Sequence, residues 1–273
     1  NLRGFAASIM YGEEGDDYIS SENMVEGAIA YGGIGDDDIN LTAPDIVDGG
    51  DGDDTINIGG SSQNILRPTS IKGGTGYDKL TISNWYPHWD RISNDFEEII
   101  IDGGTRVFSD DRTQSGKTLK ISTANLNENV NFDFSAETDA FLTISGTGIF
   151  VGGALSDTIT TYIGDDTVSG SGGDDVINTG SGDDTITGGA GNDTIDGGDG
   201  TDIAIFSGNQ ADYTITSTSY AQYQVVDNRG IDGTDTVKNV ITLRFADGDL
   251  DITPSGLDLS GTTSADILTG DIG

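Results

Sequence analysis

The feature that most constrains this chain is a repeat of nine residues between Gly152 and Ile205. The segment divides without a gap into GGALSDTIT, TYIGDDTVS, GSGGDDVIN, TGSGDDTIT, GGAGNDTID and GGDGTDIAI. In every copy the sixth place is aspartate and the eighth is apolar, and glycine dominates places one, two and four. Such units form arrays, because each can bury its single apolar residue only against its neighbours.

The spacing also predicts the local structure. Six residues rich in glycine make a tight turn, since glycine adopts left-handed dihedral angles that other residues resist. The last three residues form a short strand that points the eighth-place side chain inward. Two nonapeptides then close one coil, and successive coils stack with parallel strands, so we expect an all-β parallel β-roll or β-solenoid.

Stacked turns bring the sixth-place aspartates of successive coils together, where their carboxylates repel. A hard divalent cation between the turns reverses the sign of this interaction. Ca²⁺ takes roughly six to eight oxygen ligands, from carboxylates and main-chain carbonyls, and tolerates irregular geometry. The repeat therefore predicts a file of calcium sites.

The composition fits this interpretation. The net charge of −35 disfavours nucleic acid and anionic membranes as partners, since both need a basic face, and no run is long enough for membrane insertion. The chain has no cysteine, so disulfides do not stabilise it. With 34% hydrophobic residues and this charge, the metal-free chain buries little apolar surface, so disorder is the alternative for it.

The nonapeptides resemble the G-G-x-G-x-D-x-U-x repeat of the RTX (repeats-in-toxin) family. The resemblance implies a parallel β-roll, type I secretion and folding on external calcium. It also implies that each ion lies between two turns one coil apart. The lower turn gives carbonyls from places two and four, the upper turn gives them from places one and three, and both give the sixth-place aspartate.

Carried over to this chain, the pattern places four ions between Gly152 and Ile205. Leu155 and Tyr162 stand where glycine is usual, so we expect backbone strain at these two positions. The four ligand sets are Ser171, Gly173, Asp175 with Gly188, Ala190, Asp193; Gly180, Gly182, Asp184 with Gly197, Asp199, Asp202; Gly153, Leu155, Asp157 with Gly170, Gly172, Asp175; and Tyr162, Gly164, Asp166 with Thr179, Ser181, Asp184.

The first eighty residues contain further copies, which start at Gly12, Gly32, Gly49 and Gly73. Each start is about one coil after the last, so we expect all four turns on one side of a roll. The loops SENMVEG, TAPDIVD and SSQNILRPTS would turn the other side. Three more ions follow, for up to about seven in all, with the ligand sets Glu13, Gly15, Asp17 with Gly32, Ile34, Asp37; Gly33, Gly35, Asp37 with Gly49, Asp51, Asp54; and Gly50, Gly52, Asp54 with Gly73, Thr75, Asp78.

Two alternatives remain for these first copies. They can be acidic surface turns without metal. An EF-hand at DGDDTIN is disfavoured because the flanking sequence does not predict helices.

We expect five segments. Residues 1–81 form a β-roll with a one-sided calcium ladder, 82–151 a metal-free β-solenoid bridge, and 152–205 a β-roll with a two-sided calcium ladder. Residues 206–253 form an antiparallel β cap built from YTITST, YQVVDN and ITLRFADG, and 254–273 begin a further degenerate repeat. An independent small β domain is the alternative for the bridge.

The bridge contains NWYPHWD, with both tryptophans and the only histidine. Trp85, Tyr86 and Trp89 can form a platform that stacks on sugars, or a loop whose rings cover the end of an apolar core. His88 is a poor catalytic candidate, because no second histidine and no cysteine exists to complete a catalytic group.

Three functions are compatible with this sequence. The first is a non-enzymatic calcium-binding module of a large secreted bacterial protein, with a structural role in a surface layer (S-layer), an adhesin or an extracellular filament. The second is the non-catalytic tail of a secreted protease, lipase or epimerase, and the third is a carbohydrate-binding module. We expect extracellular or cell-surface localisation, calcium as cofactor, copies of itself or cell-surface glycans as partners, and no catalytic residues, because no His-Glu-x-x-His or Gly-x-Ser-x-Gly occurs. The chain begins with Asn1 rather than Met, so we expect it to belong to a longer protein.

Overall fold

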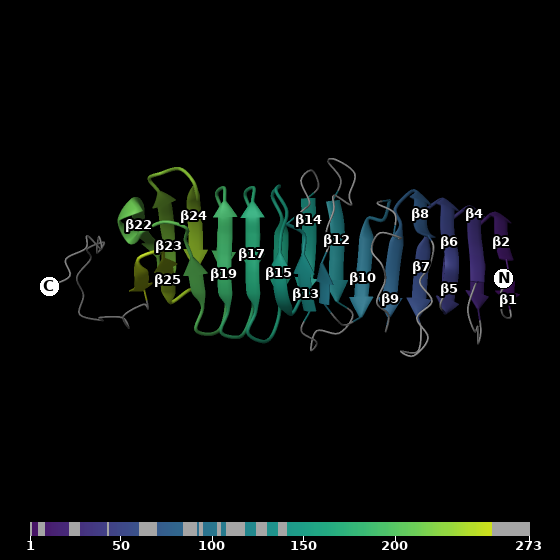
Figure 1. Cartoon of the computed structure of the whole chain (residues 1–273), viewed down its shortest axis with the longest axis horizontal. Helices are drawn as coiled ribbons and strands as arrows, with labels where there is room; N and C mark the ends of the chain where they lie inside the picture. Colours follow the sequence, from purple (N-terminus) through teal and green to yellow (C-terminus); the bar gives the residue numbers. More distant parts are fainter. Residues whose placement is uncertain are drawn as a thin grey trace.

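The computed structural model describes residues 2–4, 9–21, 28–42, 44–59, 70–83, 92, 95–102, 105–107, 118–123, 130–135 and 141–252. Regular structure in these ranges is β-strand, apart from the short 3₁₀ helix η2 (Gln210–Asp212). The strands lie side by side in one elongated stack, with β1 near one end and β22 to β26 at the other (Figure 1). The predicted all-β solenoid is confirmed.

The largest sheet has 14 strands and runs the length of the molecule. Its neighbours pair in parallel from β1 to β24, whereas β23 and β22 at the end pair antiparallel. In spatial order the strands are β1 (Leu2–Gly4), β3 (Tyr18–Ser21), β5 (Asp38–Thr42), β7 (Thr55–Gly59), β9 (Lys79–Ser83), β10 (Glu98–Asp102), β12 (Thr118–Thr123), β14 (Phe141–Gly146), β16 (Thr158–Thr161), β18 (Val176–Asn178), β20 (Thr194–Asp196), β24 (Thr234–Lys238), β23 (Gln222–Asp227) and β22 (Tyr213–Ser219).

Two shorter sheets form the other side of the coils. One has four strands and holds the starts of the first turns: β2 (Ile9–Glu14), β4 (Ala28–Ile34), β6 (Pro44–Asp51) and β8 (Ser70–Thr75). The other has eight strands: β11 (Thr105–Val107), β13 (Val130–Asp133), β15 (Gly148–Val151), β17 (Thr167–Gly172), β19 (Thr185–Ala190), β21 (Ile203–Ile205), β25 (Thr242–Phe245) and β26 (Gly248–Asp251).

The register of the repeats places the eighth-place residues directly above one another. Ile159 pairs with Ile177, and Ile177 with Ile195, while Val168 pairs with Ile186 on the other sheet. All are at most 1% exposed, as is Ala204 at the end of the second file. The predicted inward files of aliphatic side chains are therefore confirmed, and they form a core only one side chain wide per strand.

The coils between the two blocks of nonapeptides enclose larger side chains. Strands β10, β12 and β14 continue the 14-stranded sheet, and β11, β13 and β15 open the eight-stranded one. Phe132, Phe134 and Phe150 are buried there, with the Phe132 and Phe150 ring centroids 5.7 Å apart. The division of the chain into five segments stays a prediction.

The structure corrects two expectations about strands. ITLRFADG does not join YTITST and YQVVDN in one antiparallel sheet, because β25 lies on the eight-stranded sheet, parallel to β21 and antiparallel to β26. The third strand beside β23 is instead β24, which the sequence analysis did not identify. In the first block of nonapeptides, which comprises the copies in the first eighty residues, most of TAPDIVD is strand rather than loop, since β6 begins at Pro44.

Several features singled out in the sequence lie outside the described residues. These are the loop with Trp85, Tyr86, His88 and Trp89, most of SENMVEG and SSQNILRPTS, and the expected repeat at 254–273.

Candidate metal sites

The turns of the nonapeptides stack so closely that glycine is required. A Cβ on Gly191, where φ is 136°, would lie 1.9 Å from the carbonyl oxygen of Gly173 in the turn below. The same holds in the first block, where a Cβ on Gly74 would lie 1.9 Å from the Gly50 oxygen. The fourth-place and second-place carbonyls of one turn therefore point at the turn above.

The expectation of backbone strain at Leu155 and Tyr162 was wrong. Leu155 and Tyr162 do not adopt positive φ, so the turn is not strained there as predicted. The second-place residues that take positive φ without being glycine are Glu13 and Ser171, both at 78°.

The sixth-place aspartates form continuous columns along the edges of the solenoid. In each column the main-chain N–H of one aspartate donates a hydrogen bond to Oδ1 of the aspartate one coil later. The distances are 2.7 Å from Asp157 to Asp175 and 2.9 Å from Asp175 to Asp193. The same bond joins Asp166 to Asp184 and Asp184 to Asp202, at 2.8 and 3.0 Å, and links Asp17, Asp37, Asp54 and Asp78 in the first block at 2.8 to 3.0 Å.

The second carboxylate oxygen of most of these aspartates is buried and has no hydrogen-bond partner. Buried polar atoms are nearly always paired, so each such atom needs an explanation, and a bound ion is one. Asp157 differs, because its Oδ2 accepts the N–H of Gly153 at 2.8 Å. The unpartnered atoms are Oδ2 of Asp37, Asp54, Asp78, Asp166, Asp175, Asp184, Asp193 and Asp202.

These oxygens face main-chain carbonyls of the next turn. A Cβ on Gly170 would lie 2.0 Å from Asp175 Oδ2 and 2.6 Å from the Gly188 carbonyl oxygen. In the first block, a Cβ on Gly32 would lie 2.3 Å from Asp37 Oδ2 and 2.1 Å from the oxygen of Gly49. The first-place glycine thus leaves open a position where acceptors from two turns converge without a donor. A calcium ion fits such a set of oxygens.

The carboxyl groups in these columns are difficult to ionise without a cation. The pKa of Asp175 is raised to about 8 and that of Asp54 to about 7. In both, loss of hydration on burial is the largest cause, the main-chain N–H donor opposes it, and carboxylates one coil away raise the pKa further. A divalent cation would reverse the first and third of these effects.

In the second block of nonapeptides, residues 152–205, the structure brings the residues of each predicted ligand set together. Ser171 pairs with Gly189 and Gly172 with Ala190, so the turns at 170–175 and 188–193 are in register. On the opposite edge, the Asp199 N–H donates to the Gly180 carbonyl at 2.8 Å, and Gly182 N–H donates to the Asp199 carbonyl at 2.9 Å. The two lower sets stack in the same way, through Gly172 N–H to the Gly153 carbonyl and Ser181 N–H to the Tyr162 carbonyl.

The three sets of the first block are stacked as well. Glu13 pairs with Gly33, Gly33 with Gly50 and Gly50 with Gly74, which aligns the four turns on one side of the solenoid. In the described part of the chain, no three histidine, cysteine, aspartate or glutamate side chains gather as a metal cluster. Main-chain carbonyls would therefore complete the shell around two carboxylates, and this assignment of ligands stays a prediction.

Sequence reasoning missed two acids that continue the columns. Glu97 Oε2 accepts the Asp78 N–H at 2.8 Å, and Asp235 Oδ1 accepts the Asp193 N–H at 2.9 Å. Asp235 could have been found, because GIDGTDTVK, starting at Gly230, has glycine at places one and four, aspartate at six and valine at eight. Glu97 follows no such pattern.

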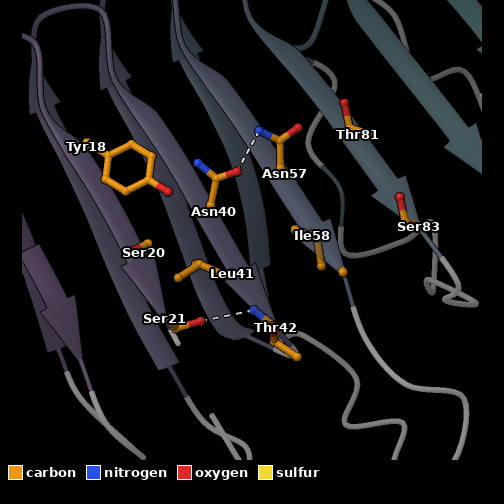
Figure 2. Close-up of a pocket in the computed structure, with 11 residues that line it drawn as sticks. Tyr18, Ser20, Ser21, Asn40, Leu41, Thr42, Asn57, Ile58, Thr81 and Ser83 are labelled. Carbon is orange, nitrogen blue, oxygen red and sulfur yellow. Dashed lines mark hydrogen bonds between the residues drawn. The ribbon is translucent and has the colours of Figure 1, made fainter. Parts of the chain in front are cut away.

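One groove in the described residues lies away from these columns. It has a volume of about 360 Å³ and lies on the outer face of β3, β5, β7 and β9 (Figure 2). Its polar lining consists of neutral hydroxyl and amide groups, including Asn57, whose Nδ2 donates to Asn40 Oδ1 at 2.9 Å. Without carboxylates, the groove is no candidate for a calcium site.

The stacked turns present buried carboxylate oxygens without a hydrogen-bond partner. This arrangement is that of a cation-binding β-solenoid. Residues 151–186, 169–204 and 178–212 each match the family model of the RTX calcium-binding nonapeptide repeat, a model that describes four copies. Residues 151–212 therefore carry RTX-type calcium-binding repeats, as the nonapeptides predict. The comparison with curated proteins gives no match. Among the described residues, no helix has the length and apolar character needed to cross a membrane.

We predict that Asp184 serves two ions and Asp202 one. Asp184 has an aspartate one coil below, Asp166, and another one coil above, Asp202, whereas Asp202 has only Asp184. Asp184→Asn should therefore lower the number of bound calcium ions by two and Asp202→Asn by one, since asparagine keeps the Oδ1 acceptor and loses the charge. Equilibrium dialysis with metal analysis gives the counts. Asp183→Asn, an exposed neighbour, is the control, and equal losses for Asp184 and Asp202 would contradict the assignment.

The raised pKa values predict that the chelated chain loses stability as the pH rises from about 4 to about 8. Unfolded carboxyl groups titrate near a pKa of about 3.9, whereas in the fold Asp193 and Asp175 hold their protons up to pKa values of about 6 and about 8. Between these limits the folded state binds more protons than the unfolded state, so the free energy of unfolding falls with pH.

The β signal in far-UV circular dichroism, recorded in chelator between pH 4 and pH 8, tests this expectation, because the metal-free chain should keep more folded structure at the lower pH. Asp175→Asn should flatten the pH dependence more than Asp174→Asn, since Asp174 is exposed. A chelated chain that is as stable at pH 8 as at pH 5 would show that the buried carboxyl groups do not control stability.

Proposed function

We propose that this chain is a calcium-dependent structural module of a large secreted bacterial protein, which folds when it meets extracellular calcium. The observation that supports it is the file of buried carboxylate oxygens without a hydrogen-bond partner, which includes Oδ2 of Asp175, Asp184 and Asp193. Up to about seven ions would occupy the ligand sets given above.

The energetics of binding favour coupling to folding. A cation that binds only the folded chain adds about 2.7 kcal/mol per site at 100 times its Kd. A few such sites equal the whole stability of a typical domain, about 5–15 kcal/mol. Each calcium ion would also offset two of the 35 net negative charges. Calcium therefore decides whether the chain folds.

This coupling suits an exported protein. The chain would be exported in a flexible, metal-poor state by the type I secretion that the family resemblance implies. External calcium would then bind the chain and fold it. Once folded, the chain is an elongated stack (Figure 1), a shape that suits a spacer in a surface layer, an adhesin or a filament. Copies of the chain and cell-surface glycans are the partners that such a role implies.

We infer that catalysis is not a function of these 273 residues. RTX repeats are typically non-catalytic, and the sequence carries no motif of a protease or lipase. The alternative role is that of a non-catalytic tail beside an enzyme domain. It differs from the structural role in requiring that the parent protein contain such a domain.

A calcium titration followed by far-UV circular dichroism tests the proposal. We expect the β signal to be lost in chelator and restored by calcium, and not restored by the same concentration of magnesium, which prefers a stricter octahedral shell. A chain with the same β signal and the same hydrodynamic radius in chelator as in calcium would contradict calcium-dependent folding.

A further inference from the structure

We propose that the groove on the outer face of β3, β5, β7 and β9 binds a neutral glycan (Figure 2). The inference rests on the proposed function and deepens it, because that function implies cell-surface glycans as partners without giving a site for them. The groove lies on the 14-stranded sheet, away from the columns of aspartate, so it is distinct from the calcium sites.

The first argument is a row of polar side chains that crosses the strands. The register places Asn40 beside Asn57, and Asn57 beside Thr81. All three point outward, because the residues on either side of each of them in the chain are buried. Neighbouring strands are about 4.8 Å apart, so a linear ligand along the row would meet one polar group at each strand.

The second argument is that the two asparagine amides have a fixed orientation. Asn40 Nδ2 donates to Asp38 Oδ1 at 2.6 Å, and Asn57 Nδ2 donates to Asn40 Oδ1 at 2.9 Å. A carboxylate can only accept, so Asp38 determines which end of the Asn40 amide faces it, and Asn40 then orients Asn57. Among the described residues, Asn57 Oδ1 accepts no hydrogen bond. Oriented donors and acceptors of this kind suit the hydroxyl groups of a sugar, each of which both donates and accepts.

The third argument is the rest of the lining, which offers further hydroxyl groups and one aromatic ring. The hydroxyl groups of Thr81 and Ser83 have no hydrogen-bond partner among the described residues. Tyr18 lines the same groove, and its side chain is 40% exposed. A tyrosine presents an apolar ring together with a polar hydroxyl group, which matches the mixed apolar and polar surface of a sugar ring.

The fourth argument is that Gly59 leaves room for a ligand. Gly59 pairs with Thr42, and a Cβ on Gly59 would have no atom within 4 Å. The turn glycines are different, because a Cβ on Gly191 would collide with the turn below. The groove has a volume of about 360 Å³, which falls within the range of about 300–1,000 Å³ for small-ligand sites. A short stretch of a glycan fits this space.

The fifth argument is the absence of charge from the described lining residues of the groove. The chain has 47 aspartate and glutamate residues against 12 lysine and arginine residues, so an acidic polysaccharide would be repelled and would find no basic side chain in this lining. A metal ion would find no carboxylate there. A purely apolar ligand would leave the amide and hydroxyl groups without partners, which costs free energy. A neutral ligand rich in hydroxyl groups is the class that remains.

The groove also depends on the calcium turns. Strands β5, β7 and β9 each begin one residue after a sixth-place aspartate, namely Asp37, Asp54 and Asp78. Calcium that orders these turns would therefore also set the register of the strands that form the polar row. We expect the calcium-loaded chain to bind the glycan and the chelated, unfolded chain not to bind it.

An array of immobilised oligosaccharides tests the groove, with the whole chain applied in calcium. The array carries neutral gluco-, manno- and galacto-oligosaccharides beside acidic ones that contain uronic acids, and calorimetry then gives the Kd for the neutral sugar bound most strongly. We expect saturable binding to a neutral sugar and none to the acidic ones. Asn57→Ala should weaken binding at least about fivefold, since it removes a hydrogen-bonding group. Gly59→Phe should abolish binding, because the ring fills the groove.

Two substitutions on the same face of the sheet serve as controls. Asn178→Ala removes an exposed asparagine on β18, and Ser145→Phe adds a ring on β14, both away from the groove. Neither should change the affinity for the sugar. Far-UV circular dichroism in calcium shows which variants are folded, and either groove variant that keeps the β signal is sufficient for the test.

The absence of saturable binding to every neutral sugar on the array would overturn the proposed groove. Binding that Asn57→Ala and Gly59→Phe both leave unchanged would also overturn it, since the sugar would then bind elsewhere. A chain that gains its β signal only in calcium but binds no sugar contradicts the groove and leaves the proposed function standing. A chain that is equally folded in chelator contradicts the proposed function, which separates the two failures.

Discussion

The sixth-place aspartates of neighbouring coils lie one strand spacing apart, buried, with one oxygen bonded to a main-chain N–H. Two unit charges held about 5 Å apart repel by roughly 3 kcal/mol at an effective dielectric constant of about 20. Burial of one aliphatic side chain contributes about 1.5–3 kcal/mol. Because each turn supplies one aspartate and one inward apolar residue, such as Asp184 and Ile186, the apolar files do not outweigh the charged columns. Divalent cations change the balance, since each converts a repulsion into several attractions.

The same constraint explains the shape of the repeats. A cation between turns needs main-chain oxygens on both sides, so the turns must approach to where a Cβ on Gly191 would meet the Gly173 oxygen at 1.9 Å. Under the proposed function, the core of residues 152–205 can then remain one apolar residue wide per strand, because calcium rather than apolar volume would supply the cohesion. Where the aspartates stop, the coils widen and fill with Phe132, Phe134 and Phe150. Stacked acidic turns and aromatic packing thus alternate along one continuous sheet.

The nonapeptides made the coil length, the inward residues such as Ile177 and the columns of aspartate predictable, since each follows from a strict period. Features that depend on contacts between distant segments were not predictable. The backbone takes positive φ at Ser171 but not at Tyr162, although both residues stand at the second place of a nonapeptide. Strand β24 was missed because a hairpin separates it from the repeats that it continues, although its sequence, GIDGTDTVK, fits the pattern. Glu97 continues the column beyond Asp78, and no motif marks it.

Anomalous diffraction from crystals grown in calcium tests the central claim most directly, because it locates the ions without reference to binding curves. The account predicts anomalous difference peaks at calcium-to-oxygen distances of about 2.3–2.6 Å from Oδ2 of Asp175, Asp184 and Asp193. Well-ordered turns with water or nothing beside these oxygens, in a buffer rich in calcium, would contradict it.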